Sequence, residues 1–269
     1  MLWRRMVNLL EENGLLHLQK YRLSSDLQNT FTISELMDNT FLTALINELT
    51  HSLGAPSEKA VGSIFIKRYA FIAVISLYAM SGSNRKINLS LDNIEMEKAL
   101  SGKDWLPKIS LKNLSIEEWD GKNRDEWRKN IYRELFANNI YLIIEQLEKN
   151  FQISRLILWE NIAVYLFWLY ETELKSSENP YVKSDFHFLF SEAEGELFGR
   201  YHNNPLQKYH SEKKYLEEFQ EEIRVRKTCC FSYQLPNSKR CKTCPCTYIA
   251  KDGRCHDGEN ICSAARSIN

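Results

Sequence analysis

The chain has 269 residues, of which 43% are hydrophobic and 12% aromatic, so it can build a substantial core as one large domain or a domain with an appendage. Lysine and arginine together number 35, as do aspartate and glutamate, and the formal net charge is zero. This neutral balance gives no support to a nucleic-acid-binding protein.

No membrane or export segment is expected from the sequence. Residues 1–13 lack a long apolar stretch and contain two acidic residues, unlike a secretory signal. A bilayer span takes ~20 apolar residues; residues 71–80 are too short a run, and 156–170 is interrupted by polar residues. We therefore expect a cytoplasmic protein with reduced thiols. A peripheral position at the inner face of the membrane is the alternative location.

The first eighty residues show the apolar spacing of helices. The spacing predicts amphipathic helices over 2–19 and 33–53, and a largely buried helix over 57–80. Thr32 followed three residues later by Glu35 predicts a capping box at the start of the second helix.

Strict alternation of apolar and polar residues then indicates strands. It predicts two strands, near 86–92 and 108–117, paired antiparallel, with a short helix over 93–100 in their connection. A two-stranded ribbon is weak alone, so this one must pack on helices.

Helical spacing returns and predicts four further helices, over 123–150, 153–174, 182–199 and 208–226. The second of these is the most apolar and is the expected central helix of a bundle. The last is rich in lysine and glutamate, so most of its face should be solvated.

Glu160 and Asn161 interrupt the predicted central helix and would be costly to bury without partners. We expect an ion pair at the edge of the bundle, with Arg155 or Arg68 as the partner. A position lining a ligand cleft is the alternative.

Four cysteines fall within sixteen residues, as Cys229, Cys230, Cys241 and Cys244 in the pattern C-C-x10-C-x2-C. Four thiolates this close repel one another, so a metal must hold them or they must oxidise. Zinc suits the C-x2-C pair, but adjacent cysteines diverge and cannot easily chelate one small ion. A [2Fe–2S] cluster offers two irons, and disulfides need an oxidising compartment. The pattern favours an iron–sulfur cluster over zinc, and zinc over disulfides.

Basic residues surround these cysteines, with Asp252 as the one acid between Ile223 and Cys255. Nearby cations stabilise a reduced cluster and raise its potential, although zinc thiolates would also favour them. The candidates for tuning the centre or docking an electron donor are Arg226, Lys227, Lys239, Arg240 and Lys242.

The cysteine pattern resembles the C-terminal signature of the bacterial ferric-siderophore reductases of the FhuF type. Further similar residues are Lys227, Tyr233, Leu235-Pro236 and Cys244-Pro245. The resemblance covers only this short stretch, and it implies that Cys229, Cys230, Cys241 and Cys244 ligate a [2Fe–2S] cluster. Cys246, Cys255 and Cys262 depart from the family pattern, and Cys246 is a possible replacement for Cys244.

The resemblance also implies an enzyme, a ferric-chelate reductase in siderophore-mediated iron acquisition. One electron converts Fe(III) to Fe(II), which oxygen chelators bind far more weakly, so the iron is released. The implied partners are a ferric siderophore of hydroxamate or citrate type and an electron donor such as a ferredoxin or a reductase. The siderophore is expected in a cleft between the helical body and the cysteines.

Two other functions remain open at this point. One is a zinc-stabilised binding module. The other is a protein of siderophore biosynthesis, which the absence of G-x-G-x-x-G and G-x-x-x-x-G-K phosphate loops disfavours.

The expected fold class is mainly α (α+β). A helical body over 1–222 carries a small antiparallel β-ribbon near 86–117, and residues 223–269 form an irregular, cysteine-rich iron–sulfur segment.

Overall fold

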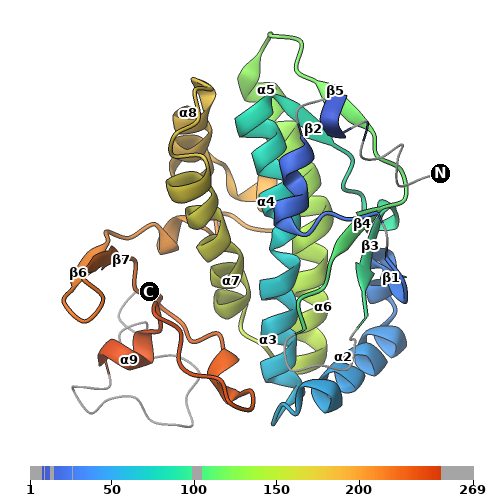
Figure 1. Ribbon diagram of the computed structural model, residues 1–269, viewed down its shortest axis with the longest axis vertical. Helices are drawn as coiled ribbons and strands as arrows, with labels where there is room; N and C mark the ends of the chain where they lie inside the picture. The colour runs from blue at the N-terminus through green and yellow to red at the C-terminus, as the bar shows by residue number, and fades with distance from the viewer. Residues whose placement is uncertain (1–7, 9, 13–14, 26, 99–104, 250–269) are drawn as a thin grey trace.

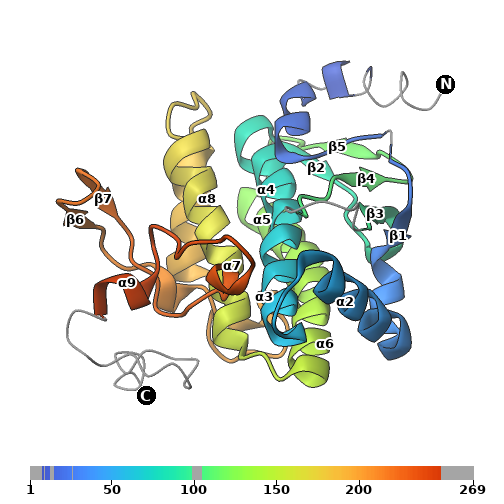
Figure 2. The same cartoon turned by 60° about the horizontal axis from the view of Figure 1, so that its bottom comes forward.

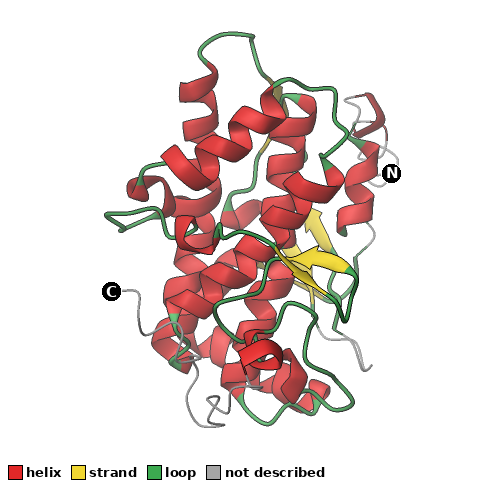
Figure 3. Ribbon diagram, turned by 90° about the vertical axis from the view of Figure 1, so that its left-hand side faces the viewer, coloured by secondary structure: helices red, strands yellow, loops and turns green. Residues whose placement is uncertain are grey.

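The computed structural model describes residues 8, 10–12, 15–25, 27–98 and 105–249. Helices dominate it, and the strands are short (Figure 3). Its helices are α2 (Asn39–Leu53), α3 (Glu58–Tyr69), α4 (Phe71–Leu77), α5 (Arg124–Tyr132), α6 (Tyr141–Phe151), α7 (Arg155–Trp168), α8 (Tyr181–His187) and α9 (Pro245–Ile249). The mainly α (α+β) class is therefore confirmed.

Four of these helices continue as a π-helical stretch, a form that elsewhere often marks functional sites. The stretches are η3 (Tyr78–Gly82) after α4, η5 (Arg133–Ile140) between α5 and α6, η6 (Leu169–Glu173) after α7 and η7 (Phe188–Glu192) after α8. The shorter turns are 3₁₀-helical: η1 (Leu16–Tyr21), η2 (Ile33–Met37), η4 (Leu91–Asn93), η8 (Gly195–Phe198), η9 (Gln207–Tyr209) and η10 (Ser232–Gln234).

The bundle is formed by α3 to α8, and α3 lies at its centre (Figure 1). Helix α3 packs against both α6 and α7, and α4 also packs against α7. The close approach of α3 is possible because Gly62 has no side chain; a Cβ there would lie 2.5 Å from Cδ1 of Ile153. The predicted helices over 57–80, 123–150 and 153–174 are confirmed, but the central position expected for the last of these belongs to α3.

Residues 58–82 form a continuous helical stretch of 25 residues that is long and apolar enough to cross a membrane by length and composition alone. Most of its apolar window, 89%, is buried inside the protein. The stretch is thus used as a core helix. The sequence predicted this helix over 57–80, but only residues 71–80 were counted as an apolar run, because Lys67 and Arg68 precede them.

The capping box predicted at Thr32 is present, because the Thr32 N–H donates to Oε2 of Glu35 at 2.7 Å. The predicted helix over 33–53 is nevertheless in two parts, η2 and α2. Asp38 separates them and accepts hydrogen bonds from the N–H groups of Thr40 and Phe41 as the N-cap of α2. Of the helix predicted over 2–19, residues 2–7, 9 and 13–14 lie outside the described part of the chain.

The predicted β-ribbon is two separate sheets with antiparallel pairing. Strand β2 (Arg85–Ile87) pairs with β5 (Ile116–Glu118), while β3 (Ile94–Glu97) pairs with both β1 (Thr30–Thr32) and β4 (Ile109–Leu111). The helix predicted over 93–100 is wrong. Ile94 and Met96 are buried on one face of β3, which is strand periodicity.

The predicted helix over 182–199 exists only as far as Glu192, through α8 and η7. The helix predicted over 208–226 is wrong. It is replaced by a hairpin of β6 (Lys214–Leu216) and β7 (Glu221–Ile223), whose turn has Gln220 in the left-handed region at φ 50°. Lysine and glutamate favour helices only weakly, and tertiary contacts override such a preference.

The cysteine segment, defined here as residues 226–249, ends in α9. Figures 1 and 2 place the segment and the β1–β3–β4 sheet on opposite sides of the bundle. The segment still belongs to the same core, because Cys229, Phe231 and Cys244 pack within the main hydrophobic cluster. The predicted boundary between 222 and 223 falls inside β7 and stays a prediction.

Candidate metal centre

Glu160 of α7 fixes the start of the cysteine segment. Its carboxylate accepts hydrogen bonds from the N–H groups of Lys227, at 2.6 Å, and Thr228, at 2.7 Å, and from the Thr228 hydroxyl. Glu160 is only 3% exposed. A buried carboxylate needs such donors, so this glutamate binds the backbone just before the vicinal cysteines.

Arg226 completes this buried junction. Its Nε lies 3.6 Å from Oε2 of Glu160, and its Nη2 donates to Oδ1 of Asn161 at 2.7 Å. Arg226 is 5% exposed. The expectation that Glu160 pairs with Arg155 or Arg68 is therefore wrong. The partner comes from the cysteine segment, sixty-six residues further along the chain.

Helix α3 holds the segment from a second side. Asn161 donates to Oγ of Ser63 at 2.9 Å, and Ser63 donates to the carbonyl oxygen of Cys230 at 3.0 Å. Further on, Pro236 lies over the end of α2, where a Cβ on Gly54 would come within 3.1 Å of its Cγ. Helices α3 and α7 of the bundle thus position the vicinal cysteines, and the end of α2 contacts the loop that follows them.

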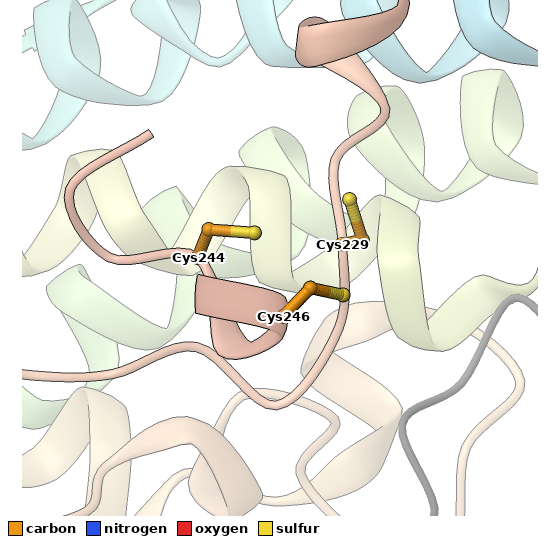
Figure 4. Close-up of side chains that lie close together, drawn as sticks. All are labelled: Cys229, Cys244 and Cys246. Atoms are coloured by element: carbon orange, nitrogen blue, oxygen red, sulfur yellow. The ribbon is translucent and has the colours of Figure 1, made fainter. Parts of the chain in front are cut away.

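The five described cysteines gather at one place. The Sγ atoms of Cys229, Cys244 and Cys246 all lie within 4.8 Å of one another (Figure 4). Cys230 forms a hydrogen-bonded pair with Cys241. Phe231 follows the vicinal pair in the left-handed region, at φ 59°, and its N–H donates to the sulfur of Cys229 at 3.4 Å.

Two cationic side chains contact these sulfurs. Lys67 of α3 places Nζ 3.8 Å from Sγ of Cys230 and 3.3 Å from Oγ of Ser232. Arg240 places Nη1 4.0 Å from Sγ of Cys244 and stacks over the ring of Tyr233 at 4.2 Å. Positive charge near sulfur favours the thiolate that binds metal.

The pKa values of the thiols follow these contacts. The hydrogen bond from Cys241 lowers the pKa of Cys230 well below its ordinary value, and Arg226 and Lys67 lower it further. The hydrogen bond from Cys229 likewise lowers the pKa of Cys244. The two donating thiols have raised pKa values.

The basic residues expected at the centre divide into two groups. Arg226 and Arg240 lie beside it. Lys242 forms an ion pair with Glu221 of the hairpin, Lys239 is exposed, and Lys227 contributes its backbone N–H to Glu160.

Lys67, Ser63 and the anchoring role of Glu160 were missed from sequence. The one sequence feature that pointed to these residues was the presence of polar side chains within strongly apolar helices.

The donor set fits a [2Fe–2S] cluster. Such a cluster takes four cysteine thiolates on two irons, and Cys229, Cys230, Cys241 and Cys244 would supply these four thiolates here. The assignment of these four as the ligands remains a prediction, because Cys246 also contacts the group. Cys255 and Cys262 lie outside the described residues.

Residues 226–245 match the family model described as the FhuF 2Fe-2S C-terminal domain. No curated protein matches the chain. The match covers the vicinal pair, Cys241 and Cys244, and with the clustered cysteines it supports a [2Fe–2S] cluster. The comparison thus supports an FhuF-type 2Fe-2S domain at residues 226–245, which is a small part of the chain.

Proposed function

We propose that this protein is a ferric-siderophore reductase that delivers one electron to Fe(III) in its chelate. The observation that carries the proposal is the match of residues 226–245 to a 2Fe-2S domain whose cysteines the chain brings together against the bundle. The substrate is the ferric chelate, and the product is Fe(II), which the same oxygen ligands bind far more weakly. A ferredoxin or a reductase supplies the electron.

A bound [2Fe–2S] cluster supplies a carrier that accepts and donates one electron at a time. Cys229, Cys230, Cys241 and Cys244 would hold it. Lys67 and Arg240 place positive charge beside two of these sulfurs, which favours the state with the extra electron. Such a reaction needs no general acid or base at the centre.

The cellular setting of this proposal is the cytoplasm, where iron is used and where thiols stay reduced. The burial of the apolar stretch 58–82 agrees with this placement. Exposed basic residues such as Lys239 could receive an acidic donor protein, because opposite charges steer such encounters.

The test is the visible spectrum of anaerobically purified protein, with iron, sulfide and zinc quantified in the same sample. A red-brown protein with about two irons and two sulfides per chain, bleached by a reductant and reoxidised by a ferric siderophore, is expected. Reduced protein that a ferric siderophore fails to reoxidise would contradict the proposal. A colourless protein with stoichiometric zinc would replace it with the binding module.

A further inference from the structure

A pocket of about 310 Å³ lies between α7, η6 and the β6–β7 hairpin. We call it the hairpin pocket. Phe167 and Trp168 form its wall on the helix side, and Ile223 lies on the hairpin side. Pockets that bind small molecules commonly start at this size and combine apolar walls with a few polar groups.

The hairpin pocket reaches the cysteine segment itself. Lys242 and Thr243 line it, and these two residues connect Cys241 to Cys244. The Thr243 carbonyl accepts a hydrogen bond from the Arg226 N–H at 2.9 Å, which holds this wall against the buried junction. A molecule in the pocket would therefore sit beside the chain that carries two of the predicted ligands.

The lining of the hairpin pocket has no net formal charge, because four acidic and four basic residues line it. Glu171 pairs with Arg224 at 2.8 Å and with Lys213 at 2.7 Å. Glu160 pairs with Arg226, and Lys242 pairs with Glu221. A strongly anionic ligand would have to compete with carboxylates that already hold these cations.

We propose that the hairpin pocket is the docking site for a ferric chelate of low net charge. This inference rests on the proposed reductase function and adds its substrate site. Three singly charged bidentate groups neutralise Fe(III), whereas three doubly charged groups leave a charge of 3−. The charge-balanced, aromatic-lined pocket suits the first, neutral kind of complex. The complex would present one edge to the loop between Cys241 and Cys244.

A second pocket offers no such arrangement. It is lined by Lys86 of β2, Glu117 of β5, Glu134 of η5 and their neighbours. None of its lining residues belongs to the cysteine segment.

Binding is tested on the cluster-loaded full chain by equilibrium dialysis with redox-inert Ga(III) complexes of a neutral tris-hydroxamate and of a tris-catecholate. Thr172 is exposed at the pocket, so Thr172→Trp narrows it without disturbing the core. Thr40→Trp, an exposed position on α2, is the matched control. We expect the neutral complex to bind wild type, to bind Thr172→Trp about tenfold or more weakly, and to bind the control as wild type.

A second variant tests the role of charge. Glu222 is an exposed residue of β7 that lines the pocket, so Glu222→Lys makes the lining net positive while leaving the fold intact. We expect the affinity for the tris-catecholate complex to rise severalfold, and that for the neutral complex to stay within about twofold. Equal binding of both complexes to wild type, with no effect of Glu222→Lys, would overturn the assignment of ligand charge.

The site and the function fail separately. If reduced wild type is reoxidised by the ferric tris-hydroxamate and Thr172→Trp is reoxidised as fast, the pocket is not the site but the reductase function stands. If no ferric chelate reoxidises wild type, the function fails. If the gallium complex then binds wild type but binds Thr172→Trp more weakly, the pocket is still identified as a chelate site.

Discussion

Lys67 shows how one residue of the bundle can act on the metal centre. Its ammonium group reaches Cys230 from α3, although the two residues are 163 positions apart. Reduction adds negative charge to the thiolate group, and a cation at this distance stabilises the reduced form. Lys67 is therefore expected to raise the reduction potential.

Lys67→Met keeps the aliphatic stem and removes the charge. We expect the visible spectrum to persist and the reduction potential to fall by a few tens of millivolts, given that about 59 mV corresponds to a tenfold change for one electron. A potentiometric titration measures the change. Lys149→Met, at an exposed position on α6, is the control with an unchanged potential. An unchanged potential in Lys67→Met would show that the contact does not influence the centre.

Cys246 is the residue that most needs a direct test, because its sulfur lies within 4.8 Å of the sulfurs of both Cys229 and Cys244. Cys241 interacts with Cys230 and also with Cys244. We expect Cys241→Ser to lose the cluster and ferric-siderophore reduction with the helical body still folded. Cys246→Ser and Cys262→Ser should keep about two irons. Iron and sulfide analysis decides this, and loss of the cluster in Cys246→Ser would place Cys246 in the ligand set as the replacement for Cys244.

At the scale of elements, the contact between α7 and the cysteine segment is the one that joins the two predicted parts of the chain. The bundle supplies a carboxylate, and the segment supplies Arg226 and two backbone N–H groups. Removing one partner of such a buried pair leaves the other charge uncompensated. The loss of folding stability should therefore be much larger here than when one partner of an exposed ion pair is removed.

Glu160→Gln should lower the free energy of unfolding by about 3–5 kcal/mol and reduce cluster content. Glu148→Gln, which breaks an ion pair with Arg155 whose side chains are 38% and 35% exposed, should cost about 1 kcal/mol or less. Thermal unfolding of the loaded proteins under anaerobic conditions compares them. Equal losses in the two variants would show that the contact at Glu160 does not hold the segment.

The sequence was most informative about elements whose contacts are local. The stripe of α3, the continuous helix from α5 to α6 and the capping box at Thr32 depend on residues within a few positions, so their periodicity and spacing predict them. The hairpin at Lys214–Ile223 was missed, because its high lysine and glutamate content favours a helix while Glu171 pairs with residues on either side of the hairpin. The cysteine pattern predicted the chemistry of the centre, but not Ser63 or Lys67, which reach it only through long-range packing.

At the scale of the whole molecule, the cysteine segment and the bundle share one core, yet they differ in what holds them. The bundle is stabilised by its own apolar helices. The segment is short, has little regular structure and brings several sulfurs together. It therefore depends on a bound metal in a way that the bundle does not.

Removal of the cluster by a chelator under reducing conditions should leave the far-ultraviolet circular dichroism nearly unchanged. Trypsin should then cleave faster after Lys239, Arg240 or Lys242, while cleavage after Lys149 in the bundle keeps its rate. Mass spectrometry of the first fragments measures both rates. A loss of helical signal together with the cluster would mean that the centre is required for the fold of the bundle as well.

The anchoring of the segment by Ser63 and Glu160 also has a consequence for biosynthesis. Both residues leave the ribosome well before Cys229, and α3, α6 and α7 can pack as soon as they have emerged. The cysteines then arrive at a finished surface that already presents the carboxylate and the hydroxyl that bind their backbone. Cluster insertion becomes a late step in maturation, and a shortage of iron or sulfide would accumulate a metal-free protein whose bundle is folded and whose cysteine segment still awaits the cluster.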